Sequence, residues 1–551
     1  MNRSRVLLAA GALALAAAAN ANAQWNPSAG QWLKTDPRDL RVMVWNIHDE
    51  VCSTNTKAEG LNGWCAAARI VAALQPDVLV MEETGDNSGN GTGSGVDSVA
   101  TLTTTLNLFL HGGTDTFNGN VAVGAYVQKY AAGYDLPYVY VSTIDDGFNR
   151  NIIMSRYPFS DLTGDTKSVI PNFTMLAASY APGGTGGIRG FIFAEIDLPN
   201  ASYGGNLVMG GGHLRSGSAS SDLAERLTAG KNIAYFIDAM FNGLGGSTPD
   251  PSNVVLDSPA ATQILSPLTP VVWGGDFNED EDTNGRDGPA LWTTRALNAS
   301  PGGTDGTDRD RSDSTFDSSV DPINGNDSTF GSSTGHNKLD YVCWQDSIAV
   351  ARRTFTFNST NYGAAAQPPQ LSGYSGGAAL ASSTASDHRP VIADFILPLP
   401  APGSFTLTTP DDFSNGVALT PTLAWTASSN AATYTVKIAD NPGLSSPILT
   451  ASGIATTSYA VPASTLVTCT TYYWGVTATN PAGTAASTPA SFSFNTYAPA
   501  DFNHDGFVSG DDFDEFVALF EYGDPGADFN GDTFVSGDDF DEFTFHFIEG
   551  C

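Results

Sequence analysis

The sequence predicts an α/β domain, followed by an all-β sandwich and a small calcium-binding helical module. Three observations lead to this order. Apolar strand-like runs and βαβ-like stretches fill the chain before residue 398, Thr/Ala/Ser-rich alternation fills residues 404–497, and two copies of an acidic loop occupy the last 51 residues. At 551 residues the chain is too long for a single hydrophobic core.

The N-terminus has the pattern of a secretory signal. Arg3 and Arg5 precede an apolar stretch over residues 6–19, and Ala21-Asn22-Ala23 supplies the small residues of a cleavage site. We therefore expect residues 1–23 to be removed and the mature protein to be secreted, extracellular or attached to the cell surface. A membrane anchor would need roughly 20 apolar residues, so we expect no transmembrane segment here or later in the chain.

Residues 24–398 are predicted to form the first domain, which ends at the Pro-rich linker LPLPAPGS. Six segments place polar residues at or after the end of an apolar run: LRVMVWNIH, PDVLVMEET, NLVMGGGHL, PVVWGGDFN, NKLDYV and SDHRPV. One such residue alone is more often a turn or capping residue. Together they supply what phosphodiester hydrolysis requires, namely cation ligands, a group that activates water, and donors for developing negative charge.

The same segments, together with NIIMSRYPF, resemble the endonuclease/exonuclease/phosphatase superfamily. That family includes secreted deoxyribonucleases, abasic-site endonucleases, sphingomyelinases and inositol-phosphate phosphatases. The resemblance extends from about Leu40 to Phe395, and GGDFN followed by a terminal SDH is its most specific part. It implies a two-sheet α/β sandwich with the site at one end of the sheets.

Asn46, Glu83 and Asp387 are the candidate metal ligands, and the expected ion is Mg²⁺ or Mn²⁺. A carboxylate such as Glu83 that closes a buried strand is costly unless a positive group meets it. Asn46 offers a neutral oxygen beside it. Asp387 is expected to complete the metal shell or to bind a second ion.

Five further residues are candidate catalytic groups. By resemblance, Asp276 orients or deprotonates the attacking water, Asn278 holds the phosphate, and His213 donates to the phosphate from the opposite side. Asp340 is expected to pair with His388 and to raise the pKa of its imidazole, because a nearby anion favours the imidazolium. The sequence leaves open whether His388 or Asp276 is the general base.

Residues 404–497 are predicted to form the β-sandwich. Leu423–Trp425, Tyr434–Ile438 and Tyr472–Val476 alternate apolar and polar residues in the manner of strands. Short spaced strands with an early Trp and a late aromatic cluster resemble a fibronectin type III-like domain. We see no catalytic group in this segment and expect it to act as a spacer, with carbohydrate or surface binding as the alternative.

The last 51 residues contain 15 Asp or Glu and no Lys or Arg. DFNHDGFVSGDD and DFNGDTFVSGDD repeat with an offset of 27 residues. Both copies fill positions 1, 3, 5, 9 and 12 of a calcium loop, with Asp501, Asn503, Asp505, Ser509 and Asp512 in the first and Asp528, Asn530, Asp532, Ser536 and Asp539 in the second. We expect both loops to bind Ca²⁺, the second more weakly because Thr533 replaces the turn glycine, Gly506.

Asp at loop position 12 and the paired copies resemble dockerin type I modules. The resemblance implies docking onto a cohesin-like or cell-surface partner. A disordered acidic tail is the alternative. The apolar spacing of Phe513, Phe516, Val517 and Phe520 instead predicts a helix after the first loop.

Five cysteines in an exported chain permit disulfides, and the odd number leaves at least one without an intrachain partner. Cys52 and Cys65 flank a short segment after the first strand and are the expected pair, with two buried thiols as the alternative. Cys343 lies in an apolar strand and is expected to pack. No partner is predicted for Cys469 or Cys551.

The formal net charge of −34 excludes the broad basic face that drives tight, salt-sensitive binding of nucleic acid. A metal ion and local arginines such as Arg150, Arg215 and Arg226 are expected to hold the cleaved phosphate instead. The favoured function is a secreted metal-dependent phosphodiesterase, a non-specific nuclease on extracellular DNA or RNA. The alternatives are a phosphoesterase on a phospholipid or small phosphorylated molecule, and a calcium-dependent surface-binding protein with an inactive first domain.

Overall fold

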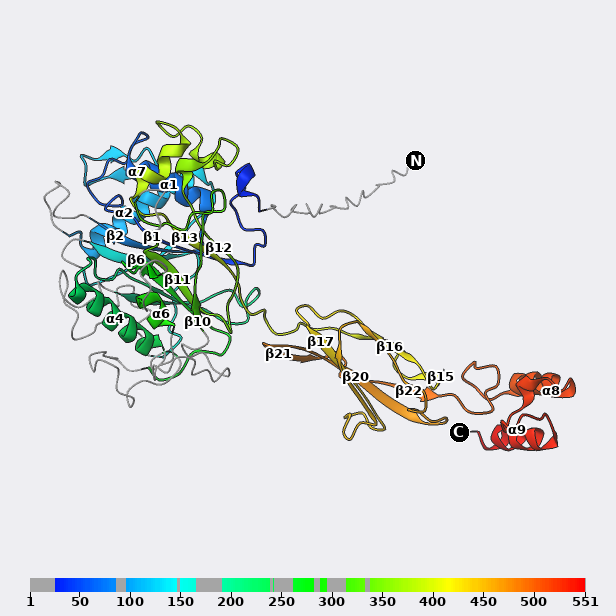
Figure 1. Ribbon diagram of the computed structural model, residues 1–551. Helices are drawn as coiled ribbons and strands as arrows, with labels where there is room; N and C mark the ends of the chain where they lie inside the picture. Colours follow the sequence, from blue (N-terminus) through cyan, green and yellow to red (C-terminus); the bar gives the residue numbers. More distant parts are fainter. Residues whose placement is uncertain are drawn as a thin grey trace, which may run out of the picture. The chain divides into compact units, whose positions relative to one another are not determined.

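The computed structural model describes residues 25–85, 96–145, 149–164, 191–237, 241, 261–281, 288–294, 314–331 and 337–550. The signal expected over residues 1–23 and Cys551 lie outside these ranges. The chain divides into two compact units, Met1–Leu198 with Asn206–Leu397 and Pro199–Gly205 with Pro398–Cys551 (Figure 1). The finer division into the domains predicted from the sequence stays a prediction.

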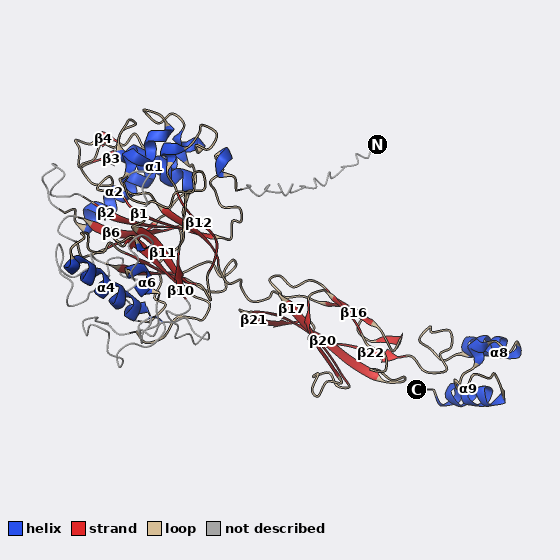
Figure 2. Cartoon of the chain, in the orientation of Figure 1, coloured by secondary structure: helices blue, strands red, loops and turns tan. Residues whose placement is uncertain are grey.

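Two β-sheets lie at the centre of the first unit (Figure 2). The six-stranded sheet has the order β12-β13-β1-β2-β6-β5 and is formed by β1 (Leu40–Asn46), β2 (Val78–Thr84), β5 (Tyr138–Val141), β6 (Arg150–Ser155), β12 (Val350–Thr356) and β13 (Val391–Ile396). The five-stranded sheet has the order β10-β11-β9-β8-β7 and is formed by β7 (Ile192–Ile196), β8 (Leu207–Gly211), β9 (Val271–Asp276), β10 (Ser314–Phe316) and β11 (Asp340–Gln345). A small hairpin joins β3 (Thr114–Asp115) and β4 (Val121–Ala122).

Helices pack on the outer face of each sheet, which gives the mixed α/β fold that the sequence predicted. One core joins Met43 and Trp45 of β1 to α1 (Gly63–Leu74) and α2 (Val99–His111), and a second joins Trp273 of β9 to α4 (Ser220–Tyr235). The shorter helices are α3 (Val127–Tyr130), α6 (Pro289–Thr293), α7 (Ala381–Ala385), η1 (Pro27–Ala29), η4 (Ser359–Asn361), η5 (Pro369–Leu371) and η6 (Ala378–Leu380). Among the described residues, no helix has both the length and the apolar character to cross a membrane.

Glycines let the two sheets approach closely on their inner faces. A Cβ on Gly274 of β9 would lie 3.1 Å from Cγ2 of Val44 in β1, and a Cβ on Gly211 of β8 would clash with Val80 of β2. Larger side chains at these positions would therefore push the sheets apart. The close approach brings the ends of β1, β2, β8 and β9 together.

The second unit begins with β-strands in two sheets. One has the order β14-β16-β19, formed by β14 (Leu407–Thr409), β16 (Thr422–Trp425) and β19 (Ser458–Ala460). The other has the order β15-β22-β20-β17-β18, with β21 paired to β20, and is formed by β15 (Ser414–Val417), β17 (Thr433–Ala439), β18 (Leu449–Ile454), β20 (Thr471–Asn480), β21 (Gly483–Ala486) and β22 (Phe492–Thr496). The three strands expected from the alternating pattern are present as β16, β17 and β20. Leu423, Trp425 and Trp474 are buried in their shared core.

Two helices follow the repeated loops, α8 (Gly510–Glu521) and α9 (Gly537–Glu549), with η7 (Pro525–Ala527) between them. Their repeat-equivalent residues Phe516 and Phe543 are fully buried and stack with ring centroids 4.0 Å apart. The helix predicted after the first loop is therefore confirmed. Because this core is built from equivalent residues of both repeats, each repeat depends on the other to bury its apolar side chains.

The expected disulfide between Cys52 and Cys65 is wrong, because both residues are free thiols. The sulfur of Cys65 lies 3.4 Å from Oε2 of Glu59, and that of Cys52 lies 3.6 Å from the Thr54 hydroxyl, so the two side chains have separate partners. Cys343 is buried and free, as predicted. Cys469, for which no partner was predicted, is disulfide-bonded.

Candidate active site

Polar residues from five strands meet at one edge of the paired sheets. Asn46 and Asp276 close β1 and β9, Glu83 lies near the end of β2, and His213 follows β8. Asp340 opens β11, which runs antiparallel to β9 so that Asp340 pairs with Asp276. Because β11 runs in the opposite direction, its first residue lies beside the last residues of β1, β2, β8 and β9.

Asp276 is the central group of this cluster. Its Oδ2 accepts a hydrogen bond from Nδ2 of Asn46 at 3.1 Å and lies 3.3 Å from Nε2 of His213 and 3.6 Å from Nε2 of His388. Its Oδ1 accepts the backbone N–H of Asn278 at 2.8 Å. The Asp276 carboxylate is thus held from three sides by groups that the sequence predicted to share one site.

His388 is fixed by Asp340. Nδ1 of His388 lies 2.8 Å from Oδ2 of Asp340, which is fully buried. This contact leaves Nε2 directed toward Asp276. The pairing of Asp340 with His388 was predicted, and the structure places the two side chains in that arrangement.

His213 links the remaining predicted residues. Its Nε2 lies 2.9 Å from the side-chain amide nitrogen of Asn278, and its Nδ1 lies 3.6 Å from Oε1 of Glu83. Asp387 lies at the rim, with 43% of its side chain exposed and Oδ1 3.7 Å from Nδ1 of His48. All of the predicted residues therefore belong to one cluster, with Asp387 at its border.

Burial and neighbouring charges separate the pKa values within the site. Burial raises the pKa of Asp276 to about 7, although His388 opposes the rise. Burial lowers the pKa of His388, but the carboxylates of Asp340 and Asp276 outweigh it and raise that pKa to about 10. Burial also raises the pKa of Glu83. Near neutral pH, His388 is therefore protonated and Asp276 lies close to its titration point.

The donor set suits a hard divalent cation. Asp276 and Asp340 each place a carboxylate oxygen within 4.8 Å of the other and of a ring nitrogen of His388, and the carboxylate oxygens are the atoms that suit such a cation. Both oxygens of Glu82 and Oδ1 of Asp340 are buried without a hydrogen bond among the described residues. Buried carboxylates of this kind are costly unless a positive charge meets them. A cation such as Mg²⁺ or Mn²⁺ would compensate them through oxygen ligands.

Several residues of the site adopt left-handed backbone conformations. The φ angle is 48° at His48, 63° at Asp49, 51° at Glu83 and 54° at Asn278. Such positions cost roughly 1–3 kcal/mol each and persist where surrounding bonds fix them. Here the N–H of His48 donates to Oδ1 of Asn46 at 3.1 Å, and the N–H of Asp49 donates to the carbonyl of Glu83 at 3.0 Å. The backbone is thus strained where it presents the predicted side chains.

Glu82 is the main residue of the site that the sequence prediction missed. It is fully buried, and burial together with Asp340 and Asp276 raises its pKa well above the usual value. Its signal in the sequence is a second carboxylate next to Glu83 at the end of an apolar strand. The sequence analysis assigned only Glu83 to the site.

The segment Thr329-Phe330 supports the catalytic groups from behind. The hydroxyl of Thr329 accepts the backbone N–H groups of Leu339 at 2.9 Å and Asp340 at 3.0 Å. The ring of Phe330 contacts that of His388 with centroids 4.8 Å apart. This segment therefore positions both members of the His388–Asp340 pair.

The arginines expected to hold phosphate are engaged elsewhere. Arg226 is buried and pairs with Glu279 at 2.9 Å, and Arg215 lies 3.2 Å from Asp222. Arg150 donates to the carbonyls of Asp97, Ser142 and Thr143. The expectation is wrong for Arg226, because its guanidinium group is buried. Arg215 and Arg150 already donate to acceptors of the protein.

The two calcium-like loops have the same internal hydrogen bonds. In the first, Oδ1 and Oδ2 of Asp501 accept the N–H groups of Asp505 and Gly506, both at 3.0 Å. In the second, Asp528 accepts those of Asp532 at 3.0 Å and Thr533 at 2.8 Å. Other ligand positions also hold the loops, because Asp512 and Asp539 form capping boxes with Ser509 and Ser536, and Asn503 and Asn530 accept from Asp505 and Asp532.

The turn position differs between the two loops. Gly506 has φ 94°, and its counterpart Thr533 has φ 79°. A β-branched residue at positive φ is strained, which agrees with the weaker second loop expected from the sequence. Within the described ranges, no further group of three acidic or imidazole side chains matches the spacing of Asp276, Asp340 and His388, in these loops or elsewhere.

No protein-family model matches this sequence, and no curated protein sequence matches it. Among solved structures, the chain is similar to a truncated TDP2 from Caenorhabditis elegans (12% identity, 65% of this chain and 98% of that chain, TM-score 0.33). It is also similar to an endonuclease/exonuclease/phosphatase family protein from Leptotrichia buccalis (13%, 65% and 100%, 0.34) and to sphingomyelinase C from Streptomyces griseocarneus (16%, 65% and 99%, 0.32).

A further similarity is to an Fn3-like protein from Clostridium thermocellum (24% identity, 17% of this chain and 90% of that chain, TM-score 0.14). Structural similarities with these TM-scores do not assign a function, so any functional proposal depends on the geometry and chemistry of the site itself.

Proposed function

We propose that the first unit is a divalent-cation-dependent phosphodiesterase whose favoured substrate is nucleic acid. The observation that carries this proposal is the arrangement of Asp340, His388 and Asp276, in which a buried carboxylate fixes a protonated imidazole 3.6 Å from a second buried carboxylate. This arrangement places a proton donor, His388, and a proton acceptor, Asp276, in one small site.

In the proposed reaction, Asp276 accepts a proton from the attacking water, and the resulting hydroxide forms the new P–O bond. Asn46 holds the Asp276 carboxylate in place through their 3.1 Å hydrogen bond. His388, held by Asp340, donates its proton to the oxygen that leaves as the old P–O bond breaks. A cation bound by Glu83 and the neighbouring oxygens would polarise the phosphate and stabilise its charge.

The pKa values favour Asp276 over His388 as the general base. A group with a pKa of about 10 is protonated at neutral pH and supplies a proton, whereas one with a pKa of about 7 can accept it. His213 and Asn278 lie beside Asp276 and would donate to the non-bridging phosphate oxygens. This assignment gives each residue one role.

The first test is nicking of a supercoiled plasmid by the mature chain with Mg²⁺, with Mn²⁺ and with EDTA. We expect metal-dependent nicking that Asp276→Asn and His388→Ala both abolish. His111→Ala is the matched control, because His111 also pairs with an aspartate, Asp135 at 2.7 Å, but on the surface of α2. Near-wild-type nicking by either site variant would contradict the proposed site.

The same preparation distinguishes the substrate classes. An inert protein on plasmid and RNA that hydrolyses sphingomyelin or a small phosphate diester would move the function to a phosphoesterase on lipids or small molecules. A protein that hydrolyses none of them with any cation would favour the remaining alternative, a calcium-dependent binding protein with an inactive first domain.

We further propose that the repeats from residue 498 form a dockerin-like module that binds Ca²⁺ in both loops. The shared hydrogen-bond pattern around Asp501 and Asp528 supports this proposal. Calcium titration should give two sites, of which Asp501→Ala removes the tighter. Sites of unchanged number and affinity in that variant would contradict the assignment.

Export and docking complete the proposal. The chain would be secreted after loss of residues 1–23, and a fibronectin type III-like spacer would carry the module to a cohesin-like or cell-surface partner. N-terminal sequencing of the extracellular protein should begin at Gln24. Deletion of residues 498–551 should release the protein from the cell surface into the medium, and unchanged retention would contradict the docking role.

A further inference from the structure

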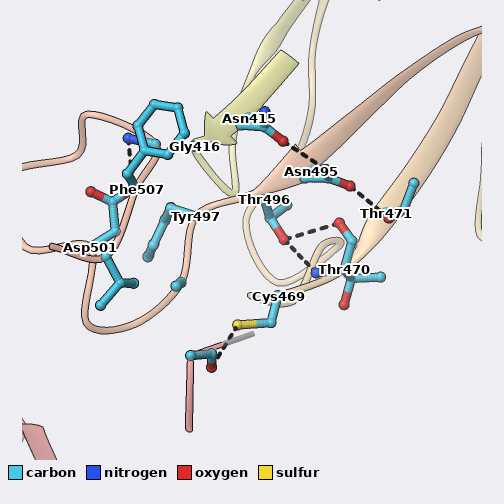
Figure 3. Close-up of a pocket in the computed structure, with 14 residues that line it drawn as sticks. Asn415, Gly416, Cys469, Thr470, Thr471, Asn495, Thr496, Tyr497, Asp501 and Phe507 are labelled. Atoms are coloured by element: carbon cyan, nitrogen blue, oxygen red, sulfur yellow. Dashed lines mark hydrogen bonds between the residues drawn. The ribbon is translucent and has the colours of Figure 1, made fainter. Parts of the chain in front are cut away.

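A cavity of about 480 Å³ lies in the second unit, far along the chain from the predicted catalytic residues (Figure 3). Its wall combines Asn415 of β15, Thr471 of β20 and Asn495 of β22 with Tyr497 and the first calcium-like loop. Its volume falls in the range of roughly 300–1,000 Å³ typical of small-molecule sites. The phosphodiesterase proposal does not use this cavity, and the calcium proposal uses only Asp501 of its wall.

The strand side of the cavity presents amide and hydroxyl groups in a fixed arrangement. Nδ2 of Asn495 donates to Oδ1 of Asn415 at 2.7 Å, and the Thr471 hydroxyl donates to Oδ1 of Asn495 at 2.6 Å (Figure 3). Nδ2 of Asn415 and the hydroxyl of Tyr497 make no hydrogen bond with the described residues, so both can bond a ligand. These groups offer neutral donors and acceptors in close proximity.

Two aromatic rings also line the cavity. Phe507 has 69% of its surface exposed, which is unusual for a side chain of this kind. Its backbone N–H donates to Oδ1 of Asp505 at 2.9 Å, which fixes the loop beneath the ring. Tyr497 packs edge-on against His504 with centroids 5.2 Å apart. The Tyr497 ring and the backbone of Phe507 are therefore held in place, while much of the Phe507 ring remains open to solvent.

The charge of the wall limits the class of ligand. Asp501 is the one charged residue among the described lining residues, and both of its oxygens already accept backbone N–H groups. No Lys, Arg or His contributes to the described wall, so an anion would meet no cationic partner and would be repelled by the acidic module. The wall is therefore unsuited to an anion, and its amide and hydroxyl groups favour a neutral ligand rich in hydroxyl or amide groups.

We propose that this cavity binds a neutral saccharide. A sugar ring presents hydroxyl groups along its edge and C–H groups on its face, which match the amides of Asn415 and Asn495 and the exposed ring of Phe507. Most of a site's specificity comes from a few fixed polar groups on such a partly apolar wall. The strand unit would then be a saccharide-binding element and not only a spacer.

The repeats supply a matched control for the test. Phe534 occupies the same position in the second loop and is 73% exposed, but it does not line the cavity. Phe507→Ala and Phe534→Ala therefore remove the same side chain from equivalent loops. Tyr497→Phe removes one hydroxyl and keeps the ring.

The experiment is calorimetric titration of the mature chain, in calcium buffer, with neutral trisaccharides of glucose, mannose, galactose and N-acetylglucosamine. We expect saturable binding of at least one of them. Phe507→Ala should weaken it by about tenfold or more, and Tyr497→Phe by about threefold to tenfold through loss of one hydrogen bond. Phe534→Ala should leave the affinity within about twofold of wild type.

Three results would overturn the proposal. They are no saturable binding of any neutral trisaccharide, equal weakening by Phe507→Ala and Phe534→Ala, and binding only of sulfated saccharides or peptides tested in parallel. Plasmid nicking measured on the same variants keeps this test separate from the catalytic proposal, because all three substitutions lie outside the first unit.

Discussion

Replacing Asp340 by Asn should shift the pH dependence of catalysis rather than simply reduce it. Asp340 is buried and lies 2.8 Å from Nδ1 of His388, whose pKa is raised to about 10. A hydrogen bond to a charged group contributes about 1.5–3 kcal/mol. At about 1.4 kcal/mol per tenfold change, its loss makes the His388 imidazolium about tenfold to a hundredfold less stable.

The assay is kcat/KM on an oligonucleotide between pH 5 and 11, because this ratio reports the free enzyme's essential groups. The kcat/KM of the wild type should rise as Asp276 loses its proton, at or below pH 7 because a bound cation lowers the pKa of Asp276. It should fall near pH 10 as His388 loses its proton. In Asp340→Asn the fall should move to about pH 8–9. Protonation alone then lowers kcat/KM by about twofold to tenfold at pH 9 and very little at pH 7.

A matched control exists on the surface. Asp135 pairs with His111 at 2.7 Å, but about a third of each side chain is exposed. Asp135→Asn should leave the pH profile unchanged. A uniform loss at every pH in Asp340→Asn, with the alkaline fall still near pH 10, would refute the reasoning and reduce Asp340 to a structural residue.

Three further predictions follow from individual residues. Thr533→Gly should tighten the second calcium site by about fivefold to thirtyfold, because a positive φ costs roughly 1–2 kcal/mol at Thr; unchanged affinity in a calcium titration would contradict the strain. Alkylation of the unfolded, unreduced protein should label Cys52, Cys65 and Cys343, and a linked Cys52–Cys65 peptide in mass mapping would contradict their free state. Glu82→Gln in EDTA should raise the melting temperature relative to wild type more at pH 8 than at pH 4.5. The folded pKa of Glu82 lies well above its unfolded value of about 4.3, so wild type loses stability as pH rises above that value; an equal effect at both pH values would be inconsistent with it.

The residues that the structure brings together could be grouped from the sequence in part because strand ends can be recognised. An apolar run followed by one polar residue indicates both a buried strand and where it ends, and the fold brings those ends to one edge. Asn46 and Asp276 fit this pattern, whereas His388 precedes a strand and was grouped with them by the family resemblance of the SDH segment. The helix after the first calcium-like loop was found from the helical spacing of its apolar residues.

The direction of side chains and the pairing of residues that are distant in the sequence could not be predicted. Cys52 and Cys65 are close in sequence, but their spacing does not show where the two sulfur atoms point. The sulfur of Cys52 lies near Thr54, and that of Cys65 lies near Glu59. Arg226 looked free because its partner, Glu279, is 53 residues away and buried with it. Glu82 was missed because only Glu83 was considered as the carboxylate that closes the strand, and burial of its neighbour by packing between the sheets is not visible in the sequence.

The acidity of the chain bears directly on how the site would work. The described part of the site gathers Glu82, Glu83, Asp276 and Asp340 around His388 and His213, and burial raises the pKa values of Glu82, Glu83 and Asp276, so these carboxyl groups become fully anionic when a cation displaces their protons. A phosphate diester is negative as well, and Arg226 is turned away to Glu279. Attraction of substrate must then come from the divalent cation and not from a basic surface. The same carboxylates that make the empty site costly are therefore what would make it selective for a metal-bound phosphate.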